Sequence, residues 1–327
     1  MRKNPALFVA SVTAFLAVAV FAACASRPAP PPANQGIHGF ISRVESGGNV
    51  AYIFGSMHLG RSEWFPLSPV VENAMARADV FAFEADMALM ALPEVSQHMG
   101  RLMSLPYGMT LEDVLPPDVF ESFVASMEAL PNVTYEMIAT LTPLGASMVI
   151  AIIELMPLMG IYSEYSVDDY VHRFATARGK PVIGLNDVFR EIDLVLGVPM
   201  DVQLTMFETP AEWEEVDWAA DWETAVQGVV DMGLVEAYEA GNIAMFQSAM
   251  GTAPDDTASL FEKHMHHVMW HVRCHIFADE IARLLLETEE PTTFFVTIGA
   301  GHIAGGDFGK VFSLLEEMGF EVEPLWN

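Results

Sequence analysis

The chain has 327 residues, of which 52% are hydrophobic and 18% are charged, so it can bury one large core or two closely packed lobes. Its formal net charge of −29 is spread along the chain, and such a surface repels phosphate backbones, which argues against nucleic-acid binding. If Cys24 carries lipid, Cys274 has no partner and no disulfide framework exists, so stability has to come from the core.

The first 23 residues are predicted to be a signal peptide of the lipoprotein type. Arg2 and Lys3 precede a long apolar run that ends in "FAAC". Two small residues before Cys24 predict lipidation of that cysteine, while cleavage after Ala25 is the competing interpretation. Either way, the mature protein is expected to be exported.

Residues 24–36 form a proline-rich stretch, which predicts a stiff, extended tether, and residues 37–327 form the folded domain. A lipidated Cys24 would anchor this domain to the membrane. An aspartate directly after the lipidated cysteine retains lipoproteins in an inner membrane, and this chain has Ala25 at that position. We therefore expect the domain at the periplasmic face of a membrane, as an outer-membrane lipoprotein.

The domain begins with two β-rich runs on either side of "ESGGN", which predict a hairpin that ends in "YIFGSMH". A short helix in "SPVVENAMARA" follows, with Ser68 as a possible N-cap, and then a strand in "DVFAFEAD". From about Met87 to Thr257 the pattern is mostly helical, which predicts a large helical insertion. Its most apolar part, "TPLGASMVIAIIELMPLMG", is interrupted by Pro143 and Glu154, so we expect a buried core helix and not a membrane span.

Within and after this region the sequence predicts a helix in "SVDDYVHRFATA", a stop at Gly179 and a strand in "PVIGL". A helical pair broken at Gly241 and a long helix over residues 260–287 come next. The chain ends with a strand in "TTFFVTIG", a helix in "KVFSLLEEM" and a closing strand in "FEVEPLW".

The two ends of the domain share the order strand, Gly-x-x-His, helix, strand. This repeat predicts an α/β fold with a central mixed sheet. Parallel strands present their carboxyl ends on one edge, where ligands bind. We therefore expect His58 and Glu84 at neighbouring strand ends, with His302 in the equivalent place of the second unit.

These motifs resemble the TraB/GumN family, which includes the pheromone-shutdown proteins and the Tiki proteases. The resemblance runs from about Val50 to Trp326 and rests on "YIFGSMHLG", "ADVFAFEAD", "KPVIGL" and "VTIGAGHIAGG". It implies metal-dependent proteolysis that uses two histidines and a glutamate, here His58, His302 and Glu84.

The same resemblance places Asp168 and Arg273 where the family has an acid and an arginine. Two positions depart from the family pattern: Asn186 stands where a glutamate is usual, and Cys274 where an asparagine is usual.

Two imidazoles and one carboxylate would suit a divalent ion such as manganese, iron, cobalt or zinc. Bound water would then have a pKa near ~7 and could attack a carbonyl. Arg273 could hold the oxyanion, and either Asp168 or Asp187 could be the base. A metal-free alternative uses His58 as a general base oriented by Glu84. The sequence contains neither G-x-S-x-G nor HExxH.

A second histidine cluster lies in "HMHHVMWHVRCH". Four of its histidines fall on one helical stripe: His264, His267, His271 and His275. They could chelate a transition metal, ligate haem or form a polar stripe, and His271 and His275 could instead line the cleft. We expect Cys274 to be a small buried residue.

Together these features predict an exported, membrane-anchored, metal-dependent hydrolase that resembles a peptidase and acts on a peptide or small hydrophobic substrate. The alternative is a non-catalytic protein that binds a peptide or haem in the same cleft.

Overall fold

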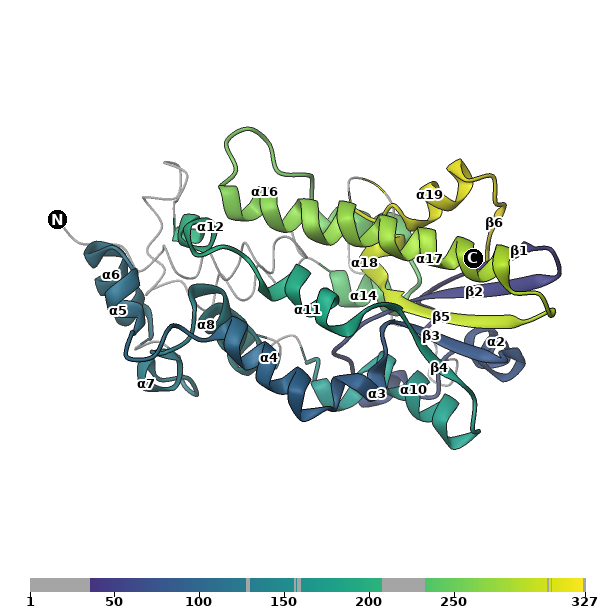
Figure 1. Ribbon diagram of the computed structural model, residues 1–327, viewed down its shortest axis with the longest axis horizontal. Coiled ribbons are helices and arrows are strands. Elements are labelled where there is room, and N and C mark those ends of the chain that lie inside the picture. The colour runs from purple at the N-terminus through teal and green to yellow at the C-terminus, as the bar shows by residue number, and fades with distance from the viewer. Residues whose placement is uncertain are drawn as a thin grey trace.

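A computed structural model describes most of the domain (Figure 1). The described residues are 36–127, 130–155, 157, 160–207, 233–304, 306 and 308–325. The predicted signal peptide, the lipidation site at Cys24 and nearly all of the predicted tether lie outside these ranges.

The predicted hairpin is present as β1 (Phe40–Ser46) and β2 (Asn49–Ser56), which pair antiparallel. Gly47 and Gly48 make the turn with φ values of +60° and +95°, a backbone conformation that glycine adopts without strain. β2 is buried along nearly its whole length, as its continuous apolar sequence indicates.

Six strands form one mixed sheet in the order β4-β3-β5-β2-β1-β6. The four further strands are β3 (Val80–Ala85), β4 (Val182–Asn186), β5 (Thr293–Gly299) and β6 (Val322–Pro324). β2, β5, β3 and β4 run parallel, whereas β1 runs antiparallel between β2 and β6. The predicted α/β fold with a mixed sheet is confirmed.

One detail of the predicted topology is wrong. β2 and β3 are not neighbours, because β5 lies between them and pairs with both. The last strand of the second unit, β6, pairs with β1 and not with β5. The second Gly-x-x-His turn is therefore inserted into the middle of the first unit, so His302 follows the strand that lies between those of His58 and Glu84.

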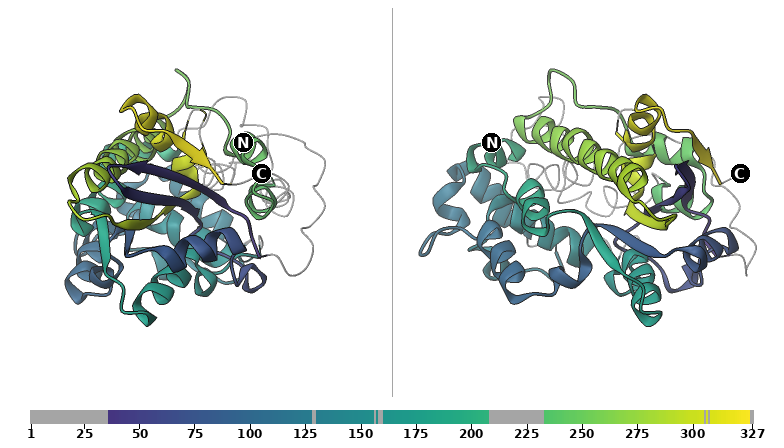
Figure 2. Two further views of the ribbon diagram at one scale, coloured as in Figure 1. Left: turned by 90° about the vertical axis from the view of Figure 1, so that its right-hand side faces the viewer. Right: turned by 45° about the vertical axis from the view of Figure 1, so that its right-hand side comes forward.

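Helices cover both faces of the sheet (Figures 1 and 2). The long helix over residues 260–287 covers one face with α19 (Val311–Glu317), and α2 (Pro69–Arg77) and α10 (Val167–Ala177) cover the other. Ser68 precedes α2 as expected, although its side chain makes no capping hydrogen bond.

The long helix has three parts: α16 (Leu260–His266), the π-helical turn η6 (His267–Val272) and α17 (Arg273–Glu287). It runs from the helical part of the molecule to the sheet (Figure 1). The sequence predicts its length correctly but gives no sign of the π-helical turn.

The predicted helical insertion is confirmed. At its start it contains α3 (Met87–Met90), α4 (Pro93–Met103), α5 (Leu111–Val114), α6 (Pro117–Met127), α7 (Tyr135–Ile138), α8 (Pro143–Ile150) and the π-helical turn η2 (Ala151–Leu155). After β4 follow α11 (Val188–Leu196), α12 (Met200–Leu204), η4 (Thr205–Phe207), α14 (Leu234–Glu239) and α15 (Ile243–Met250). Short pieces are η1 (Ser62–Trp64), η3 (Ser163–Tyr165) and α18 (Ala300–Ile303).

The most apolar stretch of the domain forms α8 and η2, and most of α8 is buried, as predicted for a core helix. Among the residues that the structure describes, no helix is both long enough and apolar enough to cross a bilayer.

Candidate functional site

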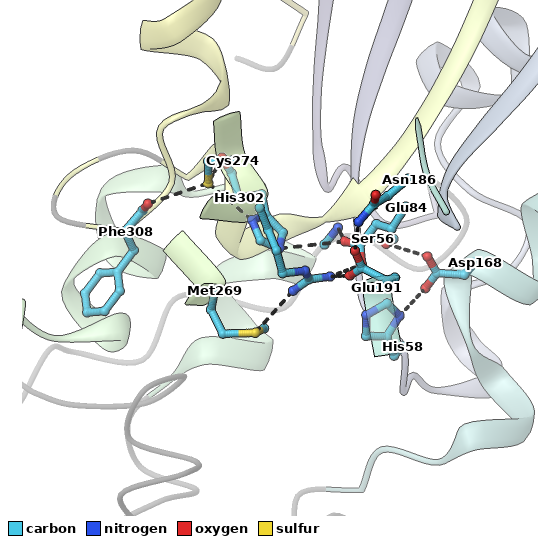
Figure 3. Close-up of polar contacts among 12 residues, drawn as sticks. Ser56, His58, Glu84, Asp168, Asn186, Glu191, Met269, Cys274, His302 and Phe308 are labelled. Carbon is cyan, nitrogen blue, oxygen red and sulfur yellow. Dashed lines mark hydrogen bonds and ion pairs between the residues drawn. The ribbon is translucent and has the colours of Figure 1, made fainter. Parts of the chain in front are cut away.

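The predicted site residues gather at the carboxyl ends of β2, β5 and β3 (Figure 3). His58 follows the end of β2 by two residues, Glu84 is the second-last residue of β3, and His302 lies in α18 directly after β5. Tyr238, on α14, stabilises this edge, because its buried hydroxyl donates a hydrogen bond of 2.8 Å to the carbonyl of Gly55 in β2.

The carboxylate that orients His58 is that of Asp168. The metal-free alternative assumed that Glu84 has this role. Asp168 Oδ2 lies 3.0 Å from His58 Nδ1, and its Oδ1 accepts a hydrogen bond of 2.8 Å from Ser56 Oγ. The Asp168 side chain is buried in the first turn of α10, whereas the His58 ring is 67% exposed. The attraction to the Asp168 carboxylate raises the pKa of His58 to about 9.

Arg273 is buried between two carboxylates at the start of α17. Its Nη2 donates a hydrogen bond of 2.5 Å to Glu84 Oε2 and forms an ion pair of 2.5 Å with Glu191 Oε1. Its side chain is only 4% exposed. A guanidinium so far from water needs such partners.

Glu84 is the centre of this cluster. Its Oε1 accepts a hydrogen bond of 2.6 Å from the backbone N–H of Gly299 and lies 3.8 Å from His302 Nε2. Burial alone would raise the pKa of Glu84, but Arg273 and His302 outweigh burial and lower it to about 2. Glu84 is therefore ionised at any physiological pH.

Glu191, on α11, is a site residue that the sequence analysis missed. Its second oxygen accepts a hydrogen bond of 2.9 Å from Asn186 Nδ2. Burial raises the pKa of Glu191, although Arg273 opposes the shift, so Glu191 takes up a proton before Glu84 as the pH falls. Asn186, at the end of β4, thus holds a carboxylate that comes from the next helix.

His302 is a neutral, buried ring. Burial and then Arg273 lower its pKa to about 3. Its Nδ1 lies 3.3 Å from the thiol of Cys274, whose own pKa burial raises to about 11. Trp270 packs against the same ring, and a side chain at Gly301 would collide with Trp270, which explains this glycine of the second motif. Cys274 is buried, as predicted.

These groups line a cavity of about 260 Å³. Its polar members are Ser56, His58, Glu84, Arg273 and His302. Its walls are mostly apolar: Met57, Leu59, Ile161, Leu234, Phe246, Met250, Met269 and Trp270. The predicted cleft therefore exists, with charged groups on one side and a methionine-rich apolar wall that can adapt to a ligand.

The arrangement does not fit a three-ligand metal site. Both oxygens of Glu84 already accept hydrogen bonds, and the Arg273 guanidinium beside it would repel a second cation. In the described part of the chain, no three His, Cys, Asp or Glu side chains are grouped so that they could hold a metal ion. These contacts do not support His58, Glu84 and His302 as a set of metal ligands, but they do not test metal binding itself, so that site stays a prediction.

Three secondary candidates lie outside the cavity. Asp187 caps α11, where its carboxylate accepts hydrogen bonds from the backbone of Phe189 and Arg190. Of the two acids that the sequence suggested as the base, Asp168 is the one that lies beside His58. His271 and His275 are not among the cavity-lining residues.

Comparison with protein-family models supports the resemblance drawn from the motifs. The model described as "TraB/PrgY/gumN family" matches residues 40–324, which is most of the chain. The chain belongs to the TraB/PrgY/gumN family. Comparisons with curated proteins and with solved structures gave no significant match. In this TraB/PrgY/gumN protein, both Gly-x-x-His motifs line one cavity.

The His58–Asp168 pair predicts a pH dependence that NMR titration can check. We expect the Asp168→Asn variant to lower the pKa of His58 from about 9 towards its ordinary value of ~6.5, because the main attraction is lost. In the unmodified protein the pair stabilises the fold fully below ~pH 6.5, and this contribution disappears as the pH rises through about 9.

The matched control is Asp169→Asn, since Asp169 is the next residue but pairs with Arg173. This control should leave the His58 titration unchanged. An unshifted His58 titration in Asp168→Asn would contradict the pairing.

Proposed function

We propose that the protein hydrolyses an ester or amide bond in a substrate that carries an apolar group near the reacting carbonyl. One observation carries this proposal: the His58–Asp168 pair lies at an apolar cavity that is also lined by the cation Arg273. A base can activate water, a cation can stabilise an oxyanion and an apolar pocket can bind the substrate, so the three together can support acyl hydrolysis.

His58 is the general base in this proposal. Its Nδ1 faces Asp168, so the other ring nitrogen is the one available to take a proton from water. The water oxygen then bonds to the carbonyl carbon. The C–O or C–N bond breaks, and His58 returns its proton to the leaving group. Asp168 orients the ring and stabilises its charged form, as the raised pKa of His58 reflects.

Arg273 and Trp270 hold the oxygen of the substrate. Within the described part of the chain, Arg273 Nη1 donates only to the thioether of Met269, at 3.3 Å, and sulfur is a weak acceptor. Among the described residues, the buried Nε of Arg273 and the indole nitrogen of Trp270 have no hydrogen-bond partner. Because both residues line the cavity, a carbonyl oxygen or carboxylate there would lie beside them and could replace the weak sulfur acceptor of Arg273 Nη1.

The size of the cavity limits the substrate. At about 260 Å³ it is slightly smaller than the ~300–1,000 Å³ of most small-molecule sites, so it suits one apolar side chain or short acyl group. A peptide with a hydrophobic residue at the cleaved bond, or a small hydrophobic ester, meets this requirement.

A non-catalytic binding protein is the second candidate. The pairing of Glu84 with Arg273 and Gly299 favours it, because this carboxylate is fixed by hydrogen bonds and cannot act as a base with a pKa of about 2. In that case the same cavity would bind the apolar part of a peptide or the edge of a haem without cleaving anything.

Hydrolysis can be tested with chromogenic esters and peptides that carry apolar acyl groups. We expect His58→Ala to lower kcat/KM by about 10²–10⁴-fold, the usual contribution of a general base. The control is His98→Gln, since His98 lies on α4 and pairs with Asp193. Because the base acts in its neutral form, log kcat/KM should rise with pH and level off near 9.

Two outcomes would replace this mechanism. Activity that chelator abolishes and manganese or cobalt restores would favour the metal site predicted from the resemblance. Absence of hydrolysis, together with saturable binding of peptide or haem that Arg273→Met removes, would favour the binding protein.

We also propose that the protein is exported and anchored to a membrane through a lipid on Cys24. The support is the "FAAC" sequence after a basic and then apolar N-terminus. Cys24→Ser should release the protein from the membrane fraction, because a signal sequence alone leaves no acyl chains. Ala25→Ser is the neighbouring control. Unchanged membrane association of Cys24→Ser would contradict the lipid anchor.

A further inference from the structure

The histidine stripe on the long helix is separate from the cavity and from the hydrolysis proposed for it. His271 is the second-last residue of the π-helical turn η6, and His275 lies one turn later in α17. His271 is exposed and His275 is half-buried, and neither lines the cavity. We propose that His271 and His275 chelate a divalent transition metal ion on this outer surface of the helix.

The spacing of the two rings matches chelation. Their centroids are 4.4 Å apart and the ring planes are inclined by 58°. With metal–nitrogen bonds of about 2.0–2.1 Å, two imidazoles at adjacent corners of a tetrahedral ion bring their ring centres to about 5 Å. A rotation of either ring within its own rotamer covers the remaining difference, and residues at i and i+4 face the same side of a helix.

One ring is already oriented as a metal ligand requires. His275 Nδ1 lies 2.8 Å from the backbone carbonyl of His271. A carbonyl oxygen only accepts, so Nδ1 carries the hydrogen and Nε2 keeps its lone pair in the neutral ring. A backbone acceptor that fixes the tautomer in this way is the usual second partner of a metal-bound histidine.

The neighbouring groups decide which ion the site prefers. The ring of His267 stacks on that of His271 with centroids 5.2 Å apart, and Lys310 approaches His271 from the α19 side. Among the described residues, neither of the two rings is paired with a carboxylate. Two neutral nitrogens without acidic oxygens favour zinc, nickel or copper over magnesium or calcium. Water would complete the coordination, because no third side chain of the described residues is grouped with the pair.

A metal here would join the π-helical turn to the first turn of α17. The same two turns carry Met269, Trp270 and Arg273 on their inner side, and these residues line the cavity. Chelation across His271 and His275 would thus stabilise the helical segment that supports the cavity wall, without contributing any ligand to the cavity itself.

The test is isothermal titration of untagged protein with zinc chloride at neutral pH, with thermal unfolding as a second measurement. We expect one zinc ion per chain from this site and a rise in Tm when zinc is present. His271→Gln and His275→Gln should each weaken zinc binding by about 10-fold or more and remove the rise in Tm, because each loses one of two ligands. The control is His172→Gln, since His172 lies on α10 against Phe83.

The variant with both His58→Ala and His302→Ala separates this site from the metal predicted in the cavity. The double variant should still bind zinc through His271 and His275, whether or not it hydrolyses any substrate. Zinc binding that survives His271→Gln and His275→Gln but is lost in the double variant would overturn the surface site. So would the absence of any zinc binding by a correctly folded protein.

Discussion

The burial of Arg273 between Glu84 and Glu191 is the constraint on which the site depends. A guanidinium with 4% exposure loses most of its hydration, and only close, well-directed carboxylates repay that loss. Arg273 comes from α17, Glu84 from β3 and Glu191 from α11, so their contact fixes two helices against the carboxyl edge of the sheet. The cluster thereby joins the helical insertion to the sheet at the point where the cavity opens.

The fixed position of Glu84 then determines the turn after β5. The hydrogen bond from the Gly299 backbone to Glu84 holds the start of the second Gly-x-x-His motif. His302 follows directly and packs between Trp270 and Phe277, which makes it a neutral wall of the cavity. The exposed His58, held separately by Asp168, is left as the solvent-facing group of this edge, and it changes its protonation state near pH 9.

The sequence predicts the parts of this site that lie at strand ends. His58 and His302 are found there because a glycine turn after an apolar strand directs the next polar residue to the sheet edge, and Glu84 because it is the second-last residue of β3. The order of the strands was not predictable, since pairing across long insertions leaves no local pattern. For that reason the placement of β5 between β2 and β3 came only from the structure.

Glu191 could have been predicted from the sequence, but from the pattern of its helix and not from the ends of the strands. It lies on the buried side of α11 with Val188 and Ile192, at helical spacing, and an acid among such apolar positions indicates a buried partner. The contact of Asp168 with His58 and Ser56 could not be predicted from the sequence, because these residues are separated by 110 and 112 positions in the chain. The π-helical turn η6 has no pattern that distinguishes it from an α-helix.

The free energy of unfolding of Arg273→Met tests the central claim most directly. Glu84 has a lowered pKa, so its contribution to stability is complete above its unfolded pKa of ~4.3 and is lost as the pH falls through about 2. At neutral pH we expect the variant to lose about 3–5 kcal/mol, because two buried carboxylates lose their cation, and the loss should shrink in acid.

Arg283→Met on the same helix is the matched control. Arg283 pairs with Glu280 and Glu287 in water, and such surface pairs contribute about 0–1 kcal/mol. The account predicts a large, pH-dependent loss of stability for Arg273→Met and a small loss for Arg283→Met. Equal losses for the two variants at neutral pH would contradict it.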